Sequence, residues 1–225
     1  MIFIVNKRKK IENVKQEYPD ADILDLTSKS EYAKQLSPFY PHGNIPIPFS
    51  DGRTATCVEA VWQGLKVFEK EGVSDSTFKN DTMKNIKRTV RKLGKPLGHQ
   101  KGLFSEELLD YFQARVQIYL PTYKWMLENV PSVIKLIERI KIRSQARDIV
   151  FLDYNTNSDY KDLSSPLSHA GLVKLYIEGN YPSPTENDCP LSKAESGKKQ
   201  KRRKTAKKKT QKSKSVEAQL NLPFD

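Results

Sequence analysis

A carboxylate, an amide and an amine recur at helical spacing beside an indole ring in one short stretch of the chain. Glu59, Gln63 and Lys66 occupy positions i, i+4 and i+7, so on a helix they form one stripe bordered by Trp62. Such a stripe can hold a polar substrate and move protons. An alternative stays open, because Thr56 and Glu59 also match a helix capping box, which would leave the amide and the amine as a solvated face.

Other residues with chemical potential lie outside this stripe. Phe39, Tyr40 and His42 belong to a proline-rich aromatic loop, and Asp153 ends an apolar run. His99 lies in a glycine-flanked basic loop that could cradle phosphates. Each has a structural alternative: Asp153 equally fits a residue that caps the loop after a strand, and the loop around His99 equally fits a flexible turn.

Three segments follow one another in an order that resembles the signature of the NADAR family. They are residues 37–41 (Ser-Pro-Phe-Tyr-Pro), the Asp-Gly turn at 51–52 and residues 59–66 (Glu-Ala-Val-Trp-Gln-Gly-Leu-Lys). The match is good over residues 37–66 and looser over most of residues 30–178. Within this family, we expect a single NADAR-like globular domain.

The resemblance implies a hydrolase that cleaves N-glycosidic bonds. One branch of the family removes ADP-ribose from modified guanine bases, and another hydrolyses ribosylamino intermediates of riboflavin synthesis. The chain departs from the family pattern at two places: Pro38 stands where the family usually has Asn, and no Trp-Gly pair follows Asp153. An N-glycoside leaves through an oxocarbenium-like state, which a carboxylate stabilises while an acid protonates the departing nitrogen.

On that basis the resemblance assigns roles to three catalytic candidates. Glu59 would stabilise positive charge or activate water, and Lys66 would act as a general acid or as an amine that traps the opened sugar. Asp153 would be a second carboxylate. The candidate substrate-binding residues are Phe39, Tyr40, His42, Trp62, Gln63 and His99.

The elements that must position these residues are mostly helical. Apolar runs predict strands at residues 2–5, 21–26 and 148–154, and the first two could pair in parallel across the helix between them. Apolar periodicity and caps predict helices at residues 7–18, 56–69, 80–93 and 166–179, one from Ser105, and two that begin near Pro121 and Pro131. The fold class expected is α+β, mainly α-helical, with a few short strands in one domain at residues 1–179.

The net charge of +12 is concentrated near the C-terminal end. Residues 193–225 contain 12 Lys and Arg against three acidic residues, whereas residues 1–192 contain 27 against 24. We expect residues 180–218 to be a disordered basic linker, because they lack the apolar content that offsets ordering entropy. The expected DNA-binding residues are Lys201, Arg202, Arg203, Lys204, Lys207, Lys208 and Lys209.

The last residues, 219–225, become apolar again. They resemble the peptides by which lesion-bypass polymerases and repair proteins dock on the bacterial sliding clamp, which would make such a clamp a partner. The expected clamp-binding residues are Gln219, Leu220, Leu222 and Phe224.

Several classes are excluded on composition. No apolar run approaches the roughly 20 residues that span a bilayer, so no membrane partner is expected. Two Cys and three His at no ligand spacing leave neither a metal site nor a disulfide framework, and no cofactor is expected. We expect a protein of the cytoplasm of a bacterium or a phage-infected cell, or of the nucleus in a eukaryote.

The combined prediction is an N-glycosidase acting on ADP-ribosylated guanine in DNA, or on a related modified nucleotide, and held on DNA by its tail. Two alternatives stay open. One is a small-molecule N-glycosidase of the riboflavin-pathway type, and the other is a non-catalytic binding protein associated with DNA or the clamp.

Overall fold

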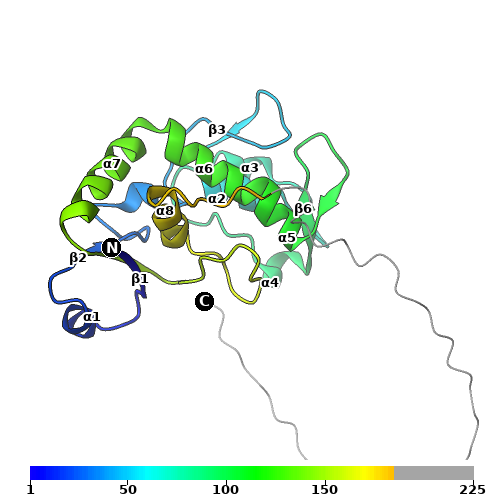
Figure 1. Ribbon diagram of the computed structural model, residues 1–225. Coiled ribbons are helices and arrows are strands. Elements are labelled where there is room, and N and C mark those ends of the chain that lie inside the picture. Colours follow the sequence, from blue (N-terminus) through cyan, green and yellow to red (C-terminus); the bar gives the residue numbers. More distant parts are fainter. Residues whose placement is uncertain (185–225) are drawn as a thin grey trace, which may run out of the picture. The chain divides into compact units, whose positions relative to one another are not determined.

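The computed structural model describes residues 1–184, which form an α+β fold with more helix than strand (Figure 1). The α+β prediction is therefore confirmed. The strands are β1 (Ile2–Asn6), β2 (Asp22–Asp25), β3 (Ile45–Pro46), β4 (Thr54–Ala55), β5 (Lys66–Phe68), β6 (Pro96–Gln100), β7 (Leu108–Leu109) and β8 (Ile149–Asp153). The α-helices are α1 (Ile11–Glu17), α2 (Val58–Gly64), α3 (Asp75–Phe78), α4 (Val90–Leu93), α5 (Tyr111–Ala114), α6 (Leu120–Asn129), α7 (Pro131–Ala146) and α8 (His169–Ile177).

A three-stranded parallel sheet joins the two ends of the folded chain. Its order is β1-β8-β2, so β8 lies between the two N-terminal strands. The expected direct pairing of those two strands is wrong, although both are parallel to β8. Alternate residues of β8 pack on opposite faces: Ile149 and Phe151 join the main core, whereas Val150 and Leu152 pack with Val14 of α1.

Helix α2 is shorter than the helix expected over residues 56–69. Its N-cap is Cys57, whose Sγ accepts from the Ala60 amide, so the capping box that begins at Thr56 is wrong. The hydroxyl of Thr56 instead donates to the carbonyl of Asn80. The helix ends at Gly64 because the next residues pair with β6 as strand β5.

The helix expected over residues 80–93 is also wrong, since only its last turn, α4, is helical. Asn80 accounts for part of the difference, because its side chain accepts from the amide of Thr82 and donates to the carbonyl of Lys84. Such local side-chain bonds compete with a helical ladder. Arg88 adds a tertiary cause, because its guanidinium bonds the carbonyls of Gln63, Lys66 and Gly72.

The next helix begins later than Ser105. Leu108 and Leu109 form a strand, and Asp110 opens α5 through a capping box with Gln113. Helix α5 passes directly into a π-helical turn at Arg115–Tyr119 and then into α6. Pro121 follows this turn and has no N–H to donate to a helical carbonyl, which favours a widened turn here. A helix beginning at Pro131 is confirmed as α7.

The last described residues still belong to the folded body. The hydroxyl of Tyr181 donates to the carbonyl of Leu120 at 2.9 Å, and its ring packs against the core.

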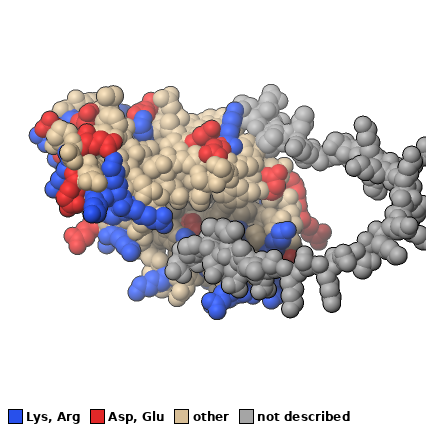
Figure 2. Space-filling view, turned by 90° about the horizontal axis from the view of Figure 1, so that it is seen from below, with Lys and Arg blue, Asp and Glu red and all other residues tan. Residues whose placement is uncertain are grey.

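Basic and acidic side chains are intermixed at the left of the face drawn in Figure 2, where α1 lies. Within residues 1–184 there is no helix of the length and apolar character needed to cross a membrane.

Candidate functional site

A cavity of about 410 Å³ opens at the carboxyl ends of β2 and β8. Residues that directly follow these strands line it, which is the usual place for a ligand on a parallel sheet. Helix α2, strand β5 and the π-helical turn supply the other walls. The lining residues are Thr27, Ser28, Ser37, Pro38, Phe39, Glu59, Trp62, Gln63, Lys66, Lys87, Tyr111, Arg115, Tyr119, Asp153, Tyr154, Asn155, Pro166, Leu167 and His169.

Glu59 is the most deeply buried acid on the helical side of the cavity, with 8% of its surface exposed. Its Oε1 accepts a hydrogen bond from Gln63 Nε2 at 2.9 Å, and the Oε1 of Gln63 accepts from the amide of Arg88 at 3.2 Å. Burial raises the pKa of Glu59, against the hydrogen bond and the positive charges of Lys87 and Lys66. The amide of Gln63 thus orients a carboxyl group whose pKa is raised by its burial.

Lys66 reaches the same cavity from strand β5 rather than from a helix. Burial lowers the pKa of its amine and the charge of Arg88 adds to this, while Glu59 opposes both. A lowered pKa increases the fraction of neutral amine, which is the form that acts as a base or nucleophile. The predicted grouping of Glu59, Gln63 and Lys66 is therefore present, but it depends on a helix followed by a strand.

Asp153 ends β8 inside the cavity and is only 3% exposed. Its Oδ2 accepts from Ser168 Oγ at 2.7 Å and lies 3.1 Å from Nδ1 of His169, whose Nε2 lies 2.9 Å from the carbonyl of Leu26. Both neighbours of the ring are acceptors, so the imidazole satisfies both only when it carries two protons.

The electrostatics agree with this assignment. Burial alone would raise the pKa of Asp153, but the hydrogen bond and charge of His169, with Ser168, hold it below its ordinary value. Burial alone would lower the pKa of His169, but Asp153 holds it above its ordinary value. The cavity therefore contains one carboxyl group whose pKa is raised, Glu59, and one whose pKa is lowered, Asp153.

The π-helical turn brings a cation and a phenol to the cavity. Arg115 is buried, and its guanidinium donates to the carbonyls of Tyr160, Asp162 and Ser165, which holds the loop before α8 in place. Burial raises the pKa of Tyr119 well above its ordinary value, and the charge of Glu59 adds to it. The phenol is therefore a neutral hydrogen-bonding group on the cavity wall.

Aromatic rings form much of the remaining wall. The Trp62 ring contacts the rings of Tyr111 and Tyr119 edge-on, with centroids 5.9 and 5.6 Å away. Phe39 lies on the wall with the amine of Lys87 5.7 Å from its ring centroid. A planar base can stack among such rings.

Three predicted binding residues do not line the cavity. Tyr40 and His42 pack on each other, with centroids 4.8 Å apart, and Nε2 of the histidine bonds the carbonyl of Gln35. His99 lies behind Trp62, with its ring centroid 3.9 Å from the indole, and is 2% exposed. Burial lowers its pKa to about 3, and neither ring nitrogen has a partner within residues 1–184.

Sequence reasoning missed several lining residues. Thr27 and Asn155 follow parallel strands, and that position was the only signal that could have located them. Arg115 and Tyr119 depend on the π-helical turn, for which Pro121 is the sole local hint. The predicted DNA-binding residues (201–204, 207–209) and clamp-binding residues (219, 220, 222, 224) lie outside the described residues.

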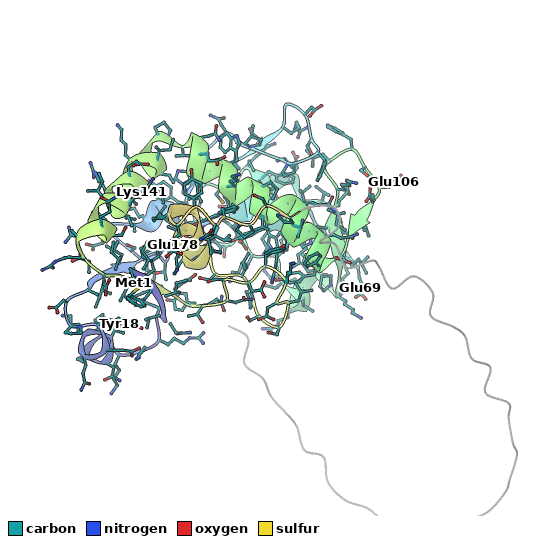
Figure 3. The ribbon with its side chains drawn as sticks, in the orientation of Figure 1. Met1, Tyr18, Glu69, Glu106, Lys141 and Glu178 are labelled. Atoms are coloured by element: carbon teal, nitrogen blue, oxygen red, sulfur yellow. The ribbon has the colours of Figure 1, made fainter. Side chains whose placement is uncertain are left out.

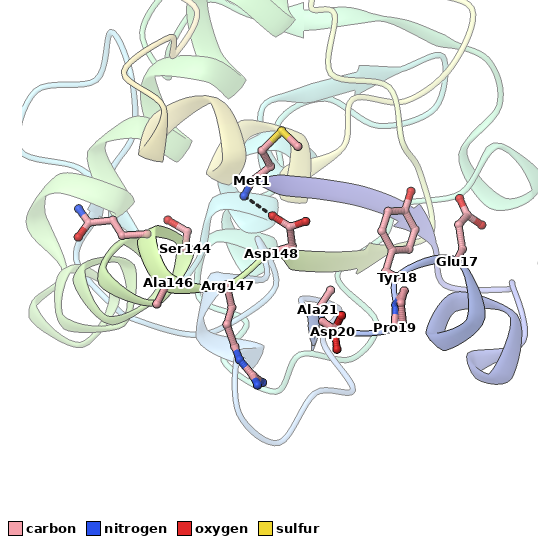
Figure 4. A pocket seen from close by; sticks show the side chains of 11 residues that line it. Met1, Glu17, Tyr18, Pro19, Asp20, Ala21, Ser144, Ala146, Arg147 and Asp148 are labelled. Carbon is pink, nitrogen blue, oxygen red and sulfur yellow. Dashed lines mark hydrogen bonds and ion pairs between the residues drawn. The ribbon is translucent and has the colours of Figure 1, made fainter.

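Two other hollows are larger but hold no comparable chemistry. One of about 550 Å³ lies beside the N-terminus, whose amine pairs with Asp148 at 2.6 Å (Figure 4). Another of about 650 Å³ lies between β2 and α7. In the first of these hollows, the Met1 amine and Asp148 are both exposed, so their contact is a surface ion pair. Across residues 1–184, no group of three or more His, Cys, Asp or Glu is placed to hold a metal ion.

The fold and cavity define an α+β protein with a polar, aromatic-walled site at the carboxyl edge of a parallel sheet. The family model described as "Family of unknown function (DUF6939)" matches residues 6–173, which is more than half of the chain. The chain belongs to this family. Searches of the curated proteins and of the solved structures found no match to this chain.

This match corrects two resemblances. Membership of the NADAR family is wrong, because the DUF6939 model covers the residues that suggested it. The short order of an aromatic loop, an Asp-Gly turn and a Glu-to-Lys helix was too small a signal, and Lys66 is not on that helix. The resemblance of residues 219–225 to clamp-binding peptides is likewise unsupported, since the matched family region ends at residue 173.

Proposed function

We propose that this protein is a hydrolase that cleaves the N-glycosidic bond of a nucleotide. The observation that carries the proposal is the pair of carboxyl groups in one cavity with opposite pKa shifts. Hydrolysis of a glycosidic bond needs one group that donates a proton and one that enters the reaction as a carboxylate. Buried Glu59 fits the first role and the ion-paired Asp153 fits the second.

The proposed step balances without a cofactor. Water attacks C1′ of the sugar while the bond from C1′ to the base nitrogen breaks, and the bonding electron pair goes to that nitrogen. Glu59 supplies the proton that the nitrogen takes up, and Asp153 accepts the proton released by the water. The carboxylate also stabilises the positive charge that develops at C1′. Solvent then returns both groups to their starting states.

The cavity walls support a nucleotide as the substrate. Trp62, Tyr111 and Phe39 offer faces and edges for a planar base, and Lys87 offers positive charge for phosphates. ADP-ribose on guanine in DNA is the substrate we put forward for the first test. The positive charge of residues 193–225 favours DNA over a free metabolite as the substrate.

The test is turnover by the full chain on two probes, an oligonucleotide containing ADP-ribosylated guanine and a ribosylamino-pyrimidine phosphate. Released base and sugar would be measured by mass spectrometry. We expect Glu59→Gln to lower kcat by at least about a hundredfold, and Glu12→Gln on α1 to serve as a matched exposed control. Turnover of the pyrimidine alone would favour a small-molecule enzyme. Binding of either probe with no turnover would overturn the proposal in favour of a binding protein.

A further inference from the structure

One segment of the folded body carries unbalanced positive charge. Residues 82–105, here called the basic segment, contain seven Lys and Arg and no Asp or Glu. The described residues, 1–184, contain 27 basic and 22 acidic residues, so those outside the basic segment, with 20 basic against 22 acidic, have a slight net negative charge. Charge concentrated in this way on a nearly neutral body indicates a polyanionic partner.

Two of the seven cations are neutralised by neighbours. Arg88 pairs with Glu71 at 3.2 Å, and Lys101 pairs with Glu107 at 3.0 Å. The other five are exposed and make no ion pair with any residue of the described chain: Lys84, Lys87, Arg91, Lys92 and Lys95. Exposed cations without acidic partners are free to contact phosphates.

The backbone of the basic segment is fixed against the strand pair β5–β6. The carbonyls of Leu93 and Lys95 accept from the amides of Lys70 and Glu69, each at 3.1 Å. Glu69, labelled in Figure 3, also accepts from the amide of Lys95 at 2.9 Å. Its carboxylate is thus engaged by the backbone, and the lysine side chains stay available.

The basic segment is continuous with the cavity. Lys87 lines the cavity wall, and the amide of the next residue, Arg88, bonds Gln63, which in turn holds Glu59. A nucleic-acid strand whose phosphates contact the exposed cations, Lys87 among them, would therefore pass the mouth of the cavity. Enzymes that act on a base within a strand need this arrangement, since they take the base into a pocket while holding the backbone outside.

We propose that Lys84, Lys87, Arg91, Lys92 and Lys95 form a nucleic-acid-binding surface that holds a single strand beside the cavity. The inference rests on the proposed function and narrows its substrate class, because it makes the substrate a base within a strand rather than a free nucleotide.

The test compares two fourfold variants of the full chain with equal charge change. One replaces Lys84, Arg91, Lys92 and Lys95 by Gln and leaves the cavity residue Lys87 in place. The control replaces Lys10, Lys15, Lys135 and Lys141 by Gln, all exposed on or next to α1 and on α7. Both keep the basic tail, so its contribution is common to all proteins.

Binding of a fluorescein-labelled 20-nucleotide single-stranded DNA would be followed by anisotropy from 50 to 300 mM salt. We expect the first variant to bind about tenfold more weakly at 150 mM salt, and its slope of log K against log salt to fall by about 0.7 for each phosphate that it no longer neutralises. The control should change both much less. If DNA binding were weakened equally in the two variants, or in neither, the proposed binding surface would be overturned.

A second readout separates this inference from the proposed function. Binding is measured without turnover, so a first variant that binds poorly supports the surface even if no N-glycosidase activity is found. If activity is found, the first variant should lower kcat/KM on the oligonucleotide and leave hydrolysis of a free nucleotide unchanged. An equal decrease on both substrates would place the residues in the cavity's own chemistry and overturn the role in strand binding.

Discussion

Asp153→Asn should strongly destabilise the fold, because it removes the negative partner of a buried imidazolium. In the native chain, Oδ2 of Asp153 receives bonds from Ser168 and from the Ala170 amide and pairs with His169, while Oδ1 accepts from the Tyr154 amide at 2.7 Å. An asparagine has one oxygen, so at least one of these donors would face an NH₂ group. Removing one partner of a buried ion pair costs about 3–5 kcal/mol.

The same pair sets the pH dependence of stability. The pKa of His169 is raised, so its contribution is fully present below the unfolded value of 6.5 and is lost as the pH rises through the folded value. The pKa of Asp153 is lowered, so its contribution is present above the unfolded value of 3.8 and is lost as the pH falls through the folded value. The unfolding free energy should therefore decline as the pH rises above 6.5. In Asp153→Asn, burial still lowers the pKa of His169, and only the bond to the Leu26 carbonyl and the charge of Asp25 oppose it, so the decline in the unfolding free energy above pH 6.5 should disappear.

Urea unfolding of the full chain at half-unit steps from pH 5 to pH 8.5 would measure both effects. Asp148→Asn is the matched control, because this aspartate precedes the same strand and its pair with the N-terminal amine is exposed, worth about 0–1 kcal/mol. The buried ion pair would be refuted if Asp153→Asn lowered the unfolding free energy no more than the control does. It would also be refuted if the unfolding free energy of Asp153→Asn depended on pH above 6.5 in the same way as that of the native chain.

Three further predictions concern the core around α2. Because burial raises the pKa of Glu59, its carboxylate form destabilises the fold above pH 4.5, so Glu59→Gln should keep or raise the unfolding free energy at pH 7; a urea midpoint corresponding to a loss above about 2 kcal/mol would contradict this. Gly64→Ala places a Cβ in steric clash with the ring of Phe78 and should cost about 1–3 kcal/mol in urea unfolding, whereas Gly72→Ala meets nothing within 4 Å and should be near neutral. Burial raises the pKa of Cys57 to about 11, so iodoacetamide at pH 8 should label it only after urea unfolding, as followed by peptide mass spectrometry; rapid labelling of the native chain would contradict its burial.

Local pattern was sufficient where a segment's own residues decide its structure. The apolar runs at residues 2–5 and 148–154 correspond to strands β1 and β8, and Pro131 opens α7 where its missing N–H costs nothing. The pattern failed where a tertiary contact competes with it. Residues 80–89 have helical apolar spacing, but Arg88 bonds three carbonyls of another segment.

The candidate site shows the same division. Glu59 and Gln63 are one helical turn apart, so their contact follows from sequence spacing alone. Lys66 was expected beside them on the same helix. In the structure it belongs to strand β5 instead, and it reaches the cavity from there.

By itself, the sequence determined which residues are apolar, which segments carry charge, and which functional side chains stand within one turn of each other. These are local properties, and they indicated an α+β body and a polar stripe on α2. Only the tertiary structure decided that β8 lies between β1 and β2, which brings Asp153 of β8 to the cavity that α2 forms with Glu59. The reason is physical: pairing of strands more than a hundred residues apart depends on burial of both faces of β8, and burial is also what gives Glu59 and Asp153 opposite pKa shifts.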